Sequence, residues 1–291
     1  MVTSLIHVAG FDTLVHHMSE LGDWETVGRG PHAALRGLVL QYAGWMERTA
    51  FTQRIEVPSP MTVLIIPFPQ PLYVAPPREP VTRRYNAFVG GLVDAFVVTE
   101  APGGIGGGLQ VSFTPLGAYR LLGMPQHLVA NAVIDAVELL GNPMRRLIDM
   151  VIDLPTWEER LDAVEAFFLA RLETAPAVTP GIAWAWRQLR ASNGAAPIGR
   201  LAETLEYRPR QFIDLFRQEV GMAPKTVARI LRFHRAIERI QLSNSVRWAD
   251  LAAECGYYDQ SHFVREFREF AGSTPSEFLG RKLPDGAGFL A

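Results

Sequence analysis

The sequence is poor in cysteine: Cys255 is the only one among 291 residues. A disulfide within the chain needs two, so the fold does not depend on disulfides, and the reducing cytoplasm is the simplest setting. The chain also lacks a basic N-terminal segment followed by an apolar run, and it has no stretch of about 18 uninterrupted apolar residues. We therefore expect a cytoplasmic protein with no secretion signal and no membrane span.

Sequence signatures of the common enzyme classes are missing as well. The chain has no His-x-His set of the cupin type, no His-Glu-x-x-His helix, no Gly-x-Ser-x-Gly elbow and no phosphate loop. The glycine-rich run 103–108 departs from the dinucleotide fingerprint, since Leu109 replaces the third glycine, and we predict a flexible hairpin loop there. His16, His17 and Glu20 have only a loose metal-like spacing. We predict no catalytic residue, no metal and no cofactor, and keep a cupin-like enzyme as an alternative.

Charge is divided unevenly along the chain. Residues 181–291 carry 16 Lys and Arg against 12 Asp and Glu, whereas the remainder carries 12 against 18. The net charge of −2 therefore conceals a basic C-terminal part and an acidic N-terminal part. This asymmetry fits contact with DNA through one end of the molecule.

A short pattern in the basic part occurs twice, about fifty residues apart. Each copy has apolar residues at helical spacing, a turn at a tyrosine, two phenylalanines four residues apart, a glycine and a proline. The copies are Leu201, Ala202, Tyr207, Phe212, Phe216, Gly221 and Pro224, and Leu251, Ala252, Tyr257, Phe263, Phe267, Gly272 and Pro275. The glycine is typical of a left-handed helix end and the proline of a new first turn. The pattern predicts two helix-turn-helix units joined by a long helix over 225–242, an arrangement suited to DNA.

Residues 197–280 resemble the DNA-binding domain of AraC/XylS-type transcription regulators, and 251–278 follow the signature of the second unit almost throughout. The resemblance implies double-stranded DNA as a partner and, for an activator, RNA polymerase. The base-reading positions it implies are Arg210, Ile213, Asp214, Gln260, Ser261, His262 and Arg265. The residues it implies for phosphate contact are Arg217, Lys225 and Arg268. Arg210 and Arg265 suit guanine and Gln260 suits adenine, whereas His262 has packing or capping as an alternative role.

The first unit departs from the family pattern at two positions. Glu206 stands where the family usually has the turn glycine, which is Gly256 in the second unit. Asp214 stands where Arg265 stands in the second unit, and a carboxylate repels phosphates but accepts from cytosine N4. We therefore predict that the second unit discriminates more between sequences, and that the first unit reads a weakly defined or cytosine-containing half-site.

The N-terminal part has a strand-like pattern interrupted by proline and glycine, after a short helix that we predict over 11–21. The predicted strands are 35–45, 51–57, 61–67, 87–99 and 109–113. The predicted helices are 126–140, 144–154 and 157–173, the last with a capping box of Thr156 and Glu159. The fold class is thus α+β: an N-terminal β-barrel or sandwich with helices, then an all-α domain.

The layout divides the chain into a β-rich sensor domain (1–122), a helical segment (123–174), a linker (175–181), a DNA-binding domain (182–283) and a tail (284–291). The front half loosely resembles the sensor domain of AraC-type regulators, which implies a cupin-like barrel and helices that serve dimerisation. We place a small-molecule pocket among Tyr42, Trp45, Ile65 and Phe113, with an apolar or aromatic ligand slightly favoured. A homodimer through the helical segment is a further hypothesis. The alternative is a constitutive DNA-binding or interaction protein without a ligand.

Overall fold

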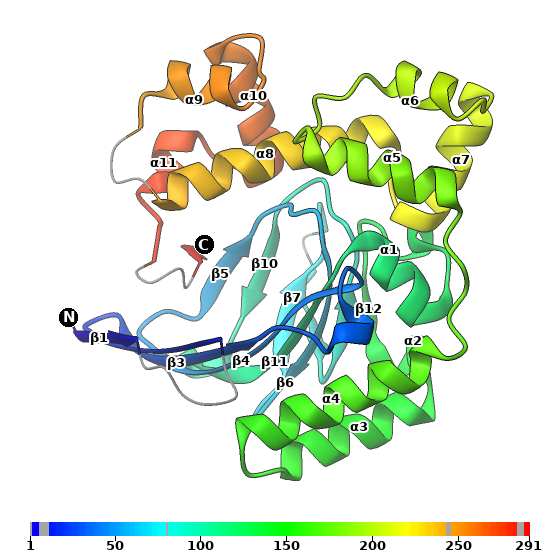
Figure 1. Ribbon diagram of the computed structural model, residues 1–291. Coiled ribbons are helices and arrows are strands. Elements are labelled where there is room, and N and C mark those ends of the chain that lie inside the picture. The colour runs from blue at the N-terminus through cyan, green and yellow to red at the C-terminus, as the bar shows by residue number, and fades with distance from the viewer. Residues whose placement is uncertain (1, 6–11, 80, 243–245, 284–287) are drawn as a thin grey trace.

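Two β-sheets make up most of the N-terminal part of the chain (Figure 1). The structure is a computed structural model and describes residues 2–5, 12–79, 81–242, 246–283 and 288–291. The larger sheet has the order β1-β2-β3-β4-β11-β6-β9-β12. Its strands are β1 (Val2–Leu5), β2 (Thr13–Ser19), β3 (Gly22–Arg29), β4 (Val39–Thr49), β11 (Ile105–Phe113), β6 (Thr62–Pro67), β9 (Phe88–Gly90) and β12 (Val133–Asp135).

The smaller sheet lies opposite and has the order β13-β5-β10-β7-β8. Its strands are β13 (Phe289–Leu290), β5 (Gln53–Glu56), β10 (Val97–Glu100), β7 (Leu72–Ala75) and β8 (Arg83–Tyr85). The two sheets do not close into a barrel. The expected architecture, a sheet-rich front half followed by helices, is confirmed in its sandwich form.

The tail that we expected over 284–291 contributes to this sandwich through its described end. Strand β13 pairs with β5, placing Phe289 opposite Ile55. The ring of Phe289 also packs on Phe278, with centroids 3.9 Å apart. The end of the helical part therefore returns to the smaller sheet and joins the two halves.

The short helix predicted over 11–21 is wrong, because Thr13–Ser19 form strand β2 and the next two residues form the turn to β3. His17 and Trp24 are cross-strand partners of β2 and β3, and their rings stack at 4.0 Å. His16 Nε2 instead lies 2.9 Å from Glu25 Oε2. Within the described ranges no cluster of three or more His, Cys, Asp or Glu side chains is placed to hold a metal ion.

The glycine run 103–108 also differs from the predicted flexible loop. Gly106, Gly107 and Gly108 lie inside strand β11, between β4 and β6. A Cβ at Gly107 would come within 2.7 Å of the Phe68 carbonyl oxygen, and one at Gly108 within 2.9 Å of the Trp45 ring. The glycines are there because the neighbouring strands leave no room for a side chain.

The helix predicted over 126–140 forms only at its end. Asn131 has a positive φ of 56°, and residues Val133–Asp135 pair with β9 as strand β12. The Asp135 carboxylate then accepts from the N–H groups of Val137 and Glu138, and so begins a new helix. The helices of this half are α1 (Pro115–Ala118), α2 (Ala136–Leu140), α3 (Asn142–Asp153) and α4 (Trp157–Leu172).

Helices α3 and α4 cover the outer face of the larger sheet (Figure 1). Phe168 of α4 packs edge-on against Phe113 of β11, with ring centroids 5.0 Å apart. The capping box predicted at the start of α4 is present: Thr156 accepts from Glu159 N, and the Glu159 carboxylate accepts from Thr156 N. This layer leaves the inner face of the larger sheet directed at the smaller one.

The C-terminal part is helical, as predicted. Its helices are α5 (Pro180–Ala191), α6 (Ile198–Thr204), α7 (Pro209–Val220), α8 (Pro224–Leu242), α9 (Trp248–Glu254), α10 (Gln260–Ala271) and α11 (Pro275–Leu279). In Figure 1 the helix α8 runs between the α6–α7 pair and the α9–α10 pair, above the sheets. In the part of the chain that the structure describes, no helix is both long enough and apolar enough to cross a membrane.

Candidate nucleic-acid interface

The two repeated units have the same backbone turn. Tyr207 N donates to Ala202 O at 3.0 Å, and Tyr257 N donates to Ala252 O at 2.9 Å. The residue before each tyrosine is left-handed: Glu206 has a φ of 55° and Gly256 a φ of 77°. The first turn thus keeps the family geometry with a non-glycine residue, in a conformation that disfavours one.

The second helices of the two units, α7 and α10, are held by matching phenylalanines. Phe212 and Phe216 of α7, and Phe263 and Phe267 of α10, are buried. Gly221 and Gly272 both end their helices with positive φ, but only Gly272, with a φ of 71° and a ψ of 0°, has the predicted left-handed conformation; Gly221 has a φ of 110° and a ψ of −38°. The face opposite the phenylalanines is left for contact with a partner.

Helix α8 fixes the separation of the two units. Its apolar stripe includes Ile230 and Phe233, and the Phe233 ring packs against Phe267 and Phe270 of the second unit at about 5 Å. Glu219 of α7 is buried and accepts from Thr179 N and Oγ1, at the start of α5. Burial raises the pKa of Glu219, while the bonds from Thr179 act in the opposite direction.

Most of the predicted DNA-contacting side chains are exposed. These are Arg210, Ile213, Asp214 and Arg217 of α7, Lys225 of α8, and Gln260, Ser261, Arg265 and Arg268 of α10. The Arg210 side chain is 96% exposed, and its Nε lies 3.9 Å from the Asp214 carboxylate. The first unit therefore presents a loosely paired arginine and carboxylate, whereas the second presents an arginine at the matching position.

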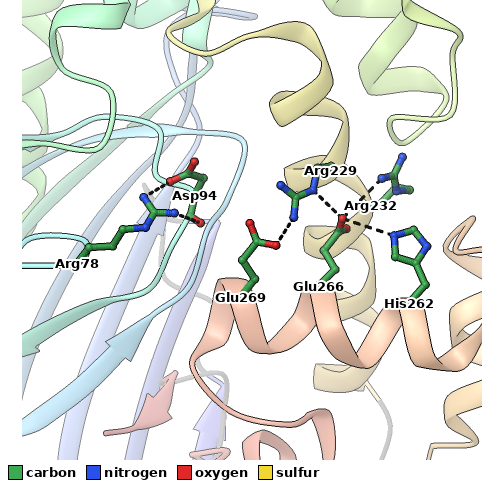
Figure 2. Close-up of polar contacts among 7 residues, drawn as sticks. All are labelled: Arg78, Asp94, Arg229, Arg232, His262, Glu266 and Glu269. Carbon is green, nitrogen blue, oxygen red and sulfur yellow. Dashed lines mark hydrogen bonds and ion pairs between the residues drawn. The ribbon is translucent and has the colours of Figure 1, made fainter.

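His262 differs from the other predicted residues, because it turns toward the protein. Figure 2 shows its ring directed at Glu266, with Nε2 4.0 Å from Glu266 Oε2. Its ring also meets Tyr257 edge-on at 5.4 Å, and its backbone N–H donates to Asp259 at the helix start. The structure thus places His262 against the turn and Glu266 with a third of its side chain exposed, and its contact with a base stays a prediction.

Glu266 is the centre of this polar cluster. Its side chain is 4% exposed, and it lies 2.7 Å from Arg229 and 3.9 Å from Arg232, both on α8 (Figure 2). Arg229 also pairs with the exposed Glu269 at 2.6 Å. Partial burial acts to lower the pKa of Arg229, but the hydrogen bonds and charges of Glu269 and Glu266 outweigh it, so the pKa is raised. The cluster sets the position of α10 on α8.

Sequence inspection missed Tyr258, which lies between α9 and α10 and is 92% exposed. A large aromatic side chain without cover, just before a recognition helix, can contact a phosphate or a sugar. The sequence does not single out Tyr258, because two adjacent aromatic residues in a turn are typical of packing against the core. Of the two tyrosines, Tyr257 is buried and Tyr258 is not.

A cavity of about 720 Å³ lies between the two sheets. Trp45 and Ile65 line it, as predicted for the pocket, but Tyr42 and Phe113 do not. These two are fully buried on the opposite face of the larger sheet, under α3 and α4. His234, Ile237 and Gln241 of α8 form part of the cavity wall, so the helix that joins the two repeated units also faces the cavity.

Comparisons with known proteins agree with the repeated units. A family model described as a helix-turn-helix domain matches residues 201–281. No curated protein sequence matches the chain.

Among solved structures, ToxT from Vibrio cholerae shares 9% identity over 89% of this chain and 98% of its own, with a TM-score of 0.46. ToxT from Vibrio cholerae O395 bound to (E)-4-(8-methylnaphthalen-1-yl)but-3-enoic acid shares 10% over 89% and 98%, with a TM-score of 0.47. A DNA-binding transcriptional dual regulator from Escherichia coli K-12 shares 24% over 36% and 100%, with a TM-score of 0.30. With the family match and the two turns described above, residues 201–281 of this chain are an AraC-type helix-turn-helix domain.

Proposed function

We propose that the protein is a one-component transcription regulator. The helix-turn-helix domain binds specific double-stranded DNA, and the N-terminal sandwich senses a small molecule. The observation that supports this most is the double role of α8, which packs against both recognition units and also lines the cavity through His234, Ile237 and Gln241. A ligand that contacts this wall acts on the element that sets the spacing of the two units.

In this proposal the second unit supplies most of the sequence discrimination. Arg265 is exposed on α10 and suits the O6 and N7 atoms of guanine, and Gln260 at the start of the helix suits adenine. Arg217, Lys225 and Arg268 contact phosphates and set the register. In the first unit Arg210 and Ile213 contact bases, and the carboxylate of Asp214 weakens binding to the phosphate backbone of the DNA.

In this proposal the chain keeps the expected division, with a sensor over 1–122, helices over 123–174, a linker over 175–181 and the DNA-binding domain over 182–283. Met150 and Ile152 are half-exposed on α3, which supports a homodimer through these helices. Sedimentation at tens of micromolar tests it, and a monomer there contradicts it. If the protein activates transcription, RNA polymerase is a further partner.

The test of DNA binding is a mobility shift on DNA from upstream of the gene for this protein and its neighbours, at two salt concentrations. We expect a discrete, salt-sensitive complex that loses about 1–3 kcal/mol of specific affinity in Arg265→Ala. Arg48→Ala is the matched control, because Arg48 is exposed on β4, outside both recognition helices and the proposed dimer helices. Equal binding by Arg265→Ala and Arg48→Ala would contradict the proposal.

A further inference from the structure

We propose that the cavity between the sheets binds an amphipathic organic cation, such as an amine with an apolar body, whose charged head lies at Glu56. This names the ligand class for the sensing site, and it rests on the proposed function only for the consequence at DNA. The binding itself depends on the charges and surfaces of the cavity wall.

The charged groups of the wall favour a cation. Among the described residues, the ionisable side chains that line the cavity are Glu47, Arg54, Glu56 and His234. Arg54 makes a bidentate ion pair with the buried Glu47, and the distance from Arg54 Nη1 to Glu47 Oε1 is 2.6 Å. These two charges offset each other, so Glu56, once ionised, gives these wall groups an excess of negative charge.

Glu56 has little hydrogen bonding of its own. The Thr99 hydroxyl donates to Glu56 Oε1 at 3.5 Å, the outer limit for such a bond. Its side chain nevertheless reaches the open volume of the cavity. Although Glu56 is exposed to the cavity, the protein atoms around it desolvate the carboxyl and raise its pKa, while Arg54 and Thr99 act to lower it. A cationic head with N–H donors would both ionise this carboxyl and satisfy its oxygens.

His234 does not supply the missing positive charge. Burial lowers the pKa of His234, although the nearby charge of Glu238, 3.4 Å from Nε2, opposes that shift. The imidazole is therefore neutral over most of the physiological range, and it offers a hydrogen bond without a full charge. A ligand carboxylate would face Glu56 with no uncommitted cation among these wall groups.

The rest of the wall suits an apolar body. Trp45, Ile65, Val74, Phe88 and Val97 face the cavity and pack together between the sheets. The indole of Trp45 adds a surface on which a cation or an aromatic ring is stabilised. A volume of about 720 Å³ is within the usual range for small-molecule sites.

The test compares three probes with the same phenylbutyl body: 4-phenylbutylamine, 4-phenylbutan-1-ol and 5-phenylpentanoate. Their binding to the full chain is measured by titration calorimetry without DNA. We expect the amine to bind at least tenfold more tightly than the carboxylate. Glu56→Gln, which keeps the shape of the side chain, is expected to reduce amine affinity about tenfold and leave the alcohol unchanged. Glu173→Gln, at an exposed helix end outside the cavity, is the control.

Two results would overturn the proposal. One is tighter binding of the carboxylate than of the amine. The other is an amine affinity that is the same in Glu56→Gln and the wild type, including the case in which none of the probes binds. Because no DNA is present, either result leaves the DNA-binding proposal standing, and that proposal is tested separately by Arg265→Ala.

Discussion

The ring of Phe96 lies directly against Gly272, so that a Cβ on Gly272 would come within 2.5 Å of Phe96 Cε1. Phe96 belongs to the segment between β9 and β10, and Gly272 ends the recognition helix α10 with a φ of 71°. Gly91 and Val93 of the same segment line the cavity. Asp94 is held by Arg78 at 2.7 Å, as Figure 2 shows. One short segment thus contacts both the proposed ligand site and the second DNA-binding unit.

This contact predicts that Gly272→Ala is more harmful than an equivalent change elsewhere. Gly256→Ala is the matched variant, because Gly256 is also left-handed but a Cβ there would meet only Arg232 Cδ at 3.7 Å. We expect Gly256→Ala to destabilise by about 1 kcal/mol from backbone strain alone. Gly272→Ala should cost at least about 1 kcal/mol more, since the new methyl group displaces Phe96. Urea unfolding measures both.

A double variant separates the contact from the strain. In a Phe96→Ala background the displaced ring is gone, and we expect Gly272→Ala to cost no more than Gly256→Ala does. If the excess cost of Gly272→Ala persists without the ring, the close approach of Phe96 is not its cause.

In the turn of the first helix-turn-helix unit, we expect replacement of Glu206 by glycine to stabilise the protein. Glu206 has a φ of 55° at the position where the second unit has Gly256. Replacing Glu206 by glycine removes the left-handed strain at some cost in unfolded-chain entropy, and we expect a net gain of about 0.5–1 kcal/mol in thermal or urea unfolding. Glu203→Gly, inside α6, should instead destabilise by about 1 kcal/mol. A loss of stability in Glu206→Gly would mean that the side chain makes a favourable contact.

The two helix-turn-helix units were predictable from sequence, because local turn and helix-end residues define each of them. The tyrosine turn, the paired phenylalanines and the terminal glycine each have one conformational role, and they recur at matching positions. The inward direction of His262 was not predictable, since it depends on Glu266 meeting Arg229 and Arg232 of another helix.

Two of the four residues predicted for the pocket line the cavity and two do not, and strand geometry explains the difference on β4. Tyr42 and Trp45 are three residues apart on β4, so their side chains lie on opposite faces of the sheet. Composition alone does not say which face is the inner one, because both faces of this sheet are covered by apolar side chains. The strand β12 was missed for a related reason: Val133 and its neighbours fit a helical period, and only pairing with β9 decides their conformation.

The cluster on α10 predicts unequal effects of two similar changes. Glu266 and Glu269 both pair with Arg229, but Glu266 is 4% exposed and Glu269 is 49% exposed. We expect Glu266→Gln to destabilise by about 2–3 kcal/mol, because it removes one of the two charge partners of the half-buried Arg229 and the acidic neighbour of Arg232. This is below the cost of a fully buried pair, since Arg229 is itself 26% exposed.

Glu269→Gln is the control for that experiment and should cost less than about 1 kcal/mol. Urea unfolding measures stability, and the mobility shift shows whether a change in the packing of α10 against α8 also weakens DNA binding. Equal losses in the two variants would mean that burial of Glu266 does not decide the energy of the cluster.

We expect removal of the Asp214 carboxylate to strengthen DNA binding. It is exposed on α7, 3.9 Å from Arg210, at the position that Arg265 occupies on α10. Near the DNA backbone its carboxylate repels phosphates and draws the charge of Arg210 away from them. Asp214→Ala should therefore tighten non-specific binding about two- to fivefold at 0.1 M salt, where screening leaves only short-range charge effects. Asp23→Asn, at an exposed position on β3, is the control for net charge. The gain in affinity should shrink as the salt concentration rises, because it is electrostatic.

Equal or weaker binding by Asp214→Ala would mean that this carboxylate does not face phosphates, and that it contacts a base such as cytosine instead.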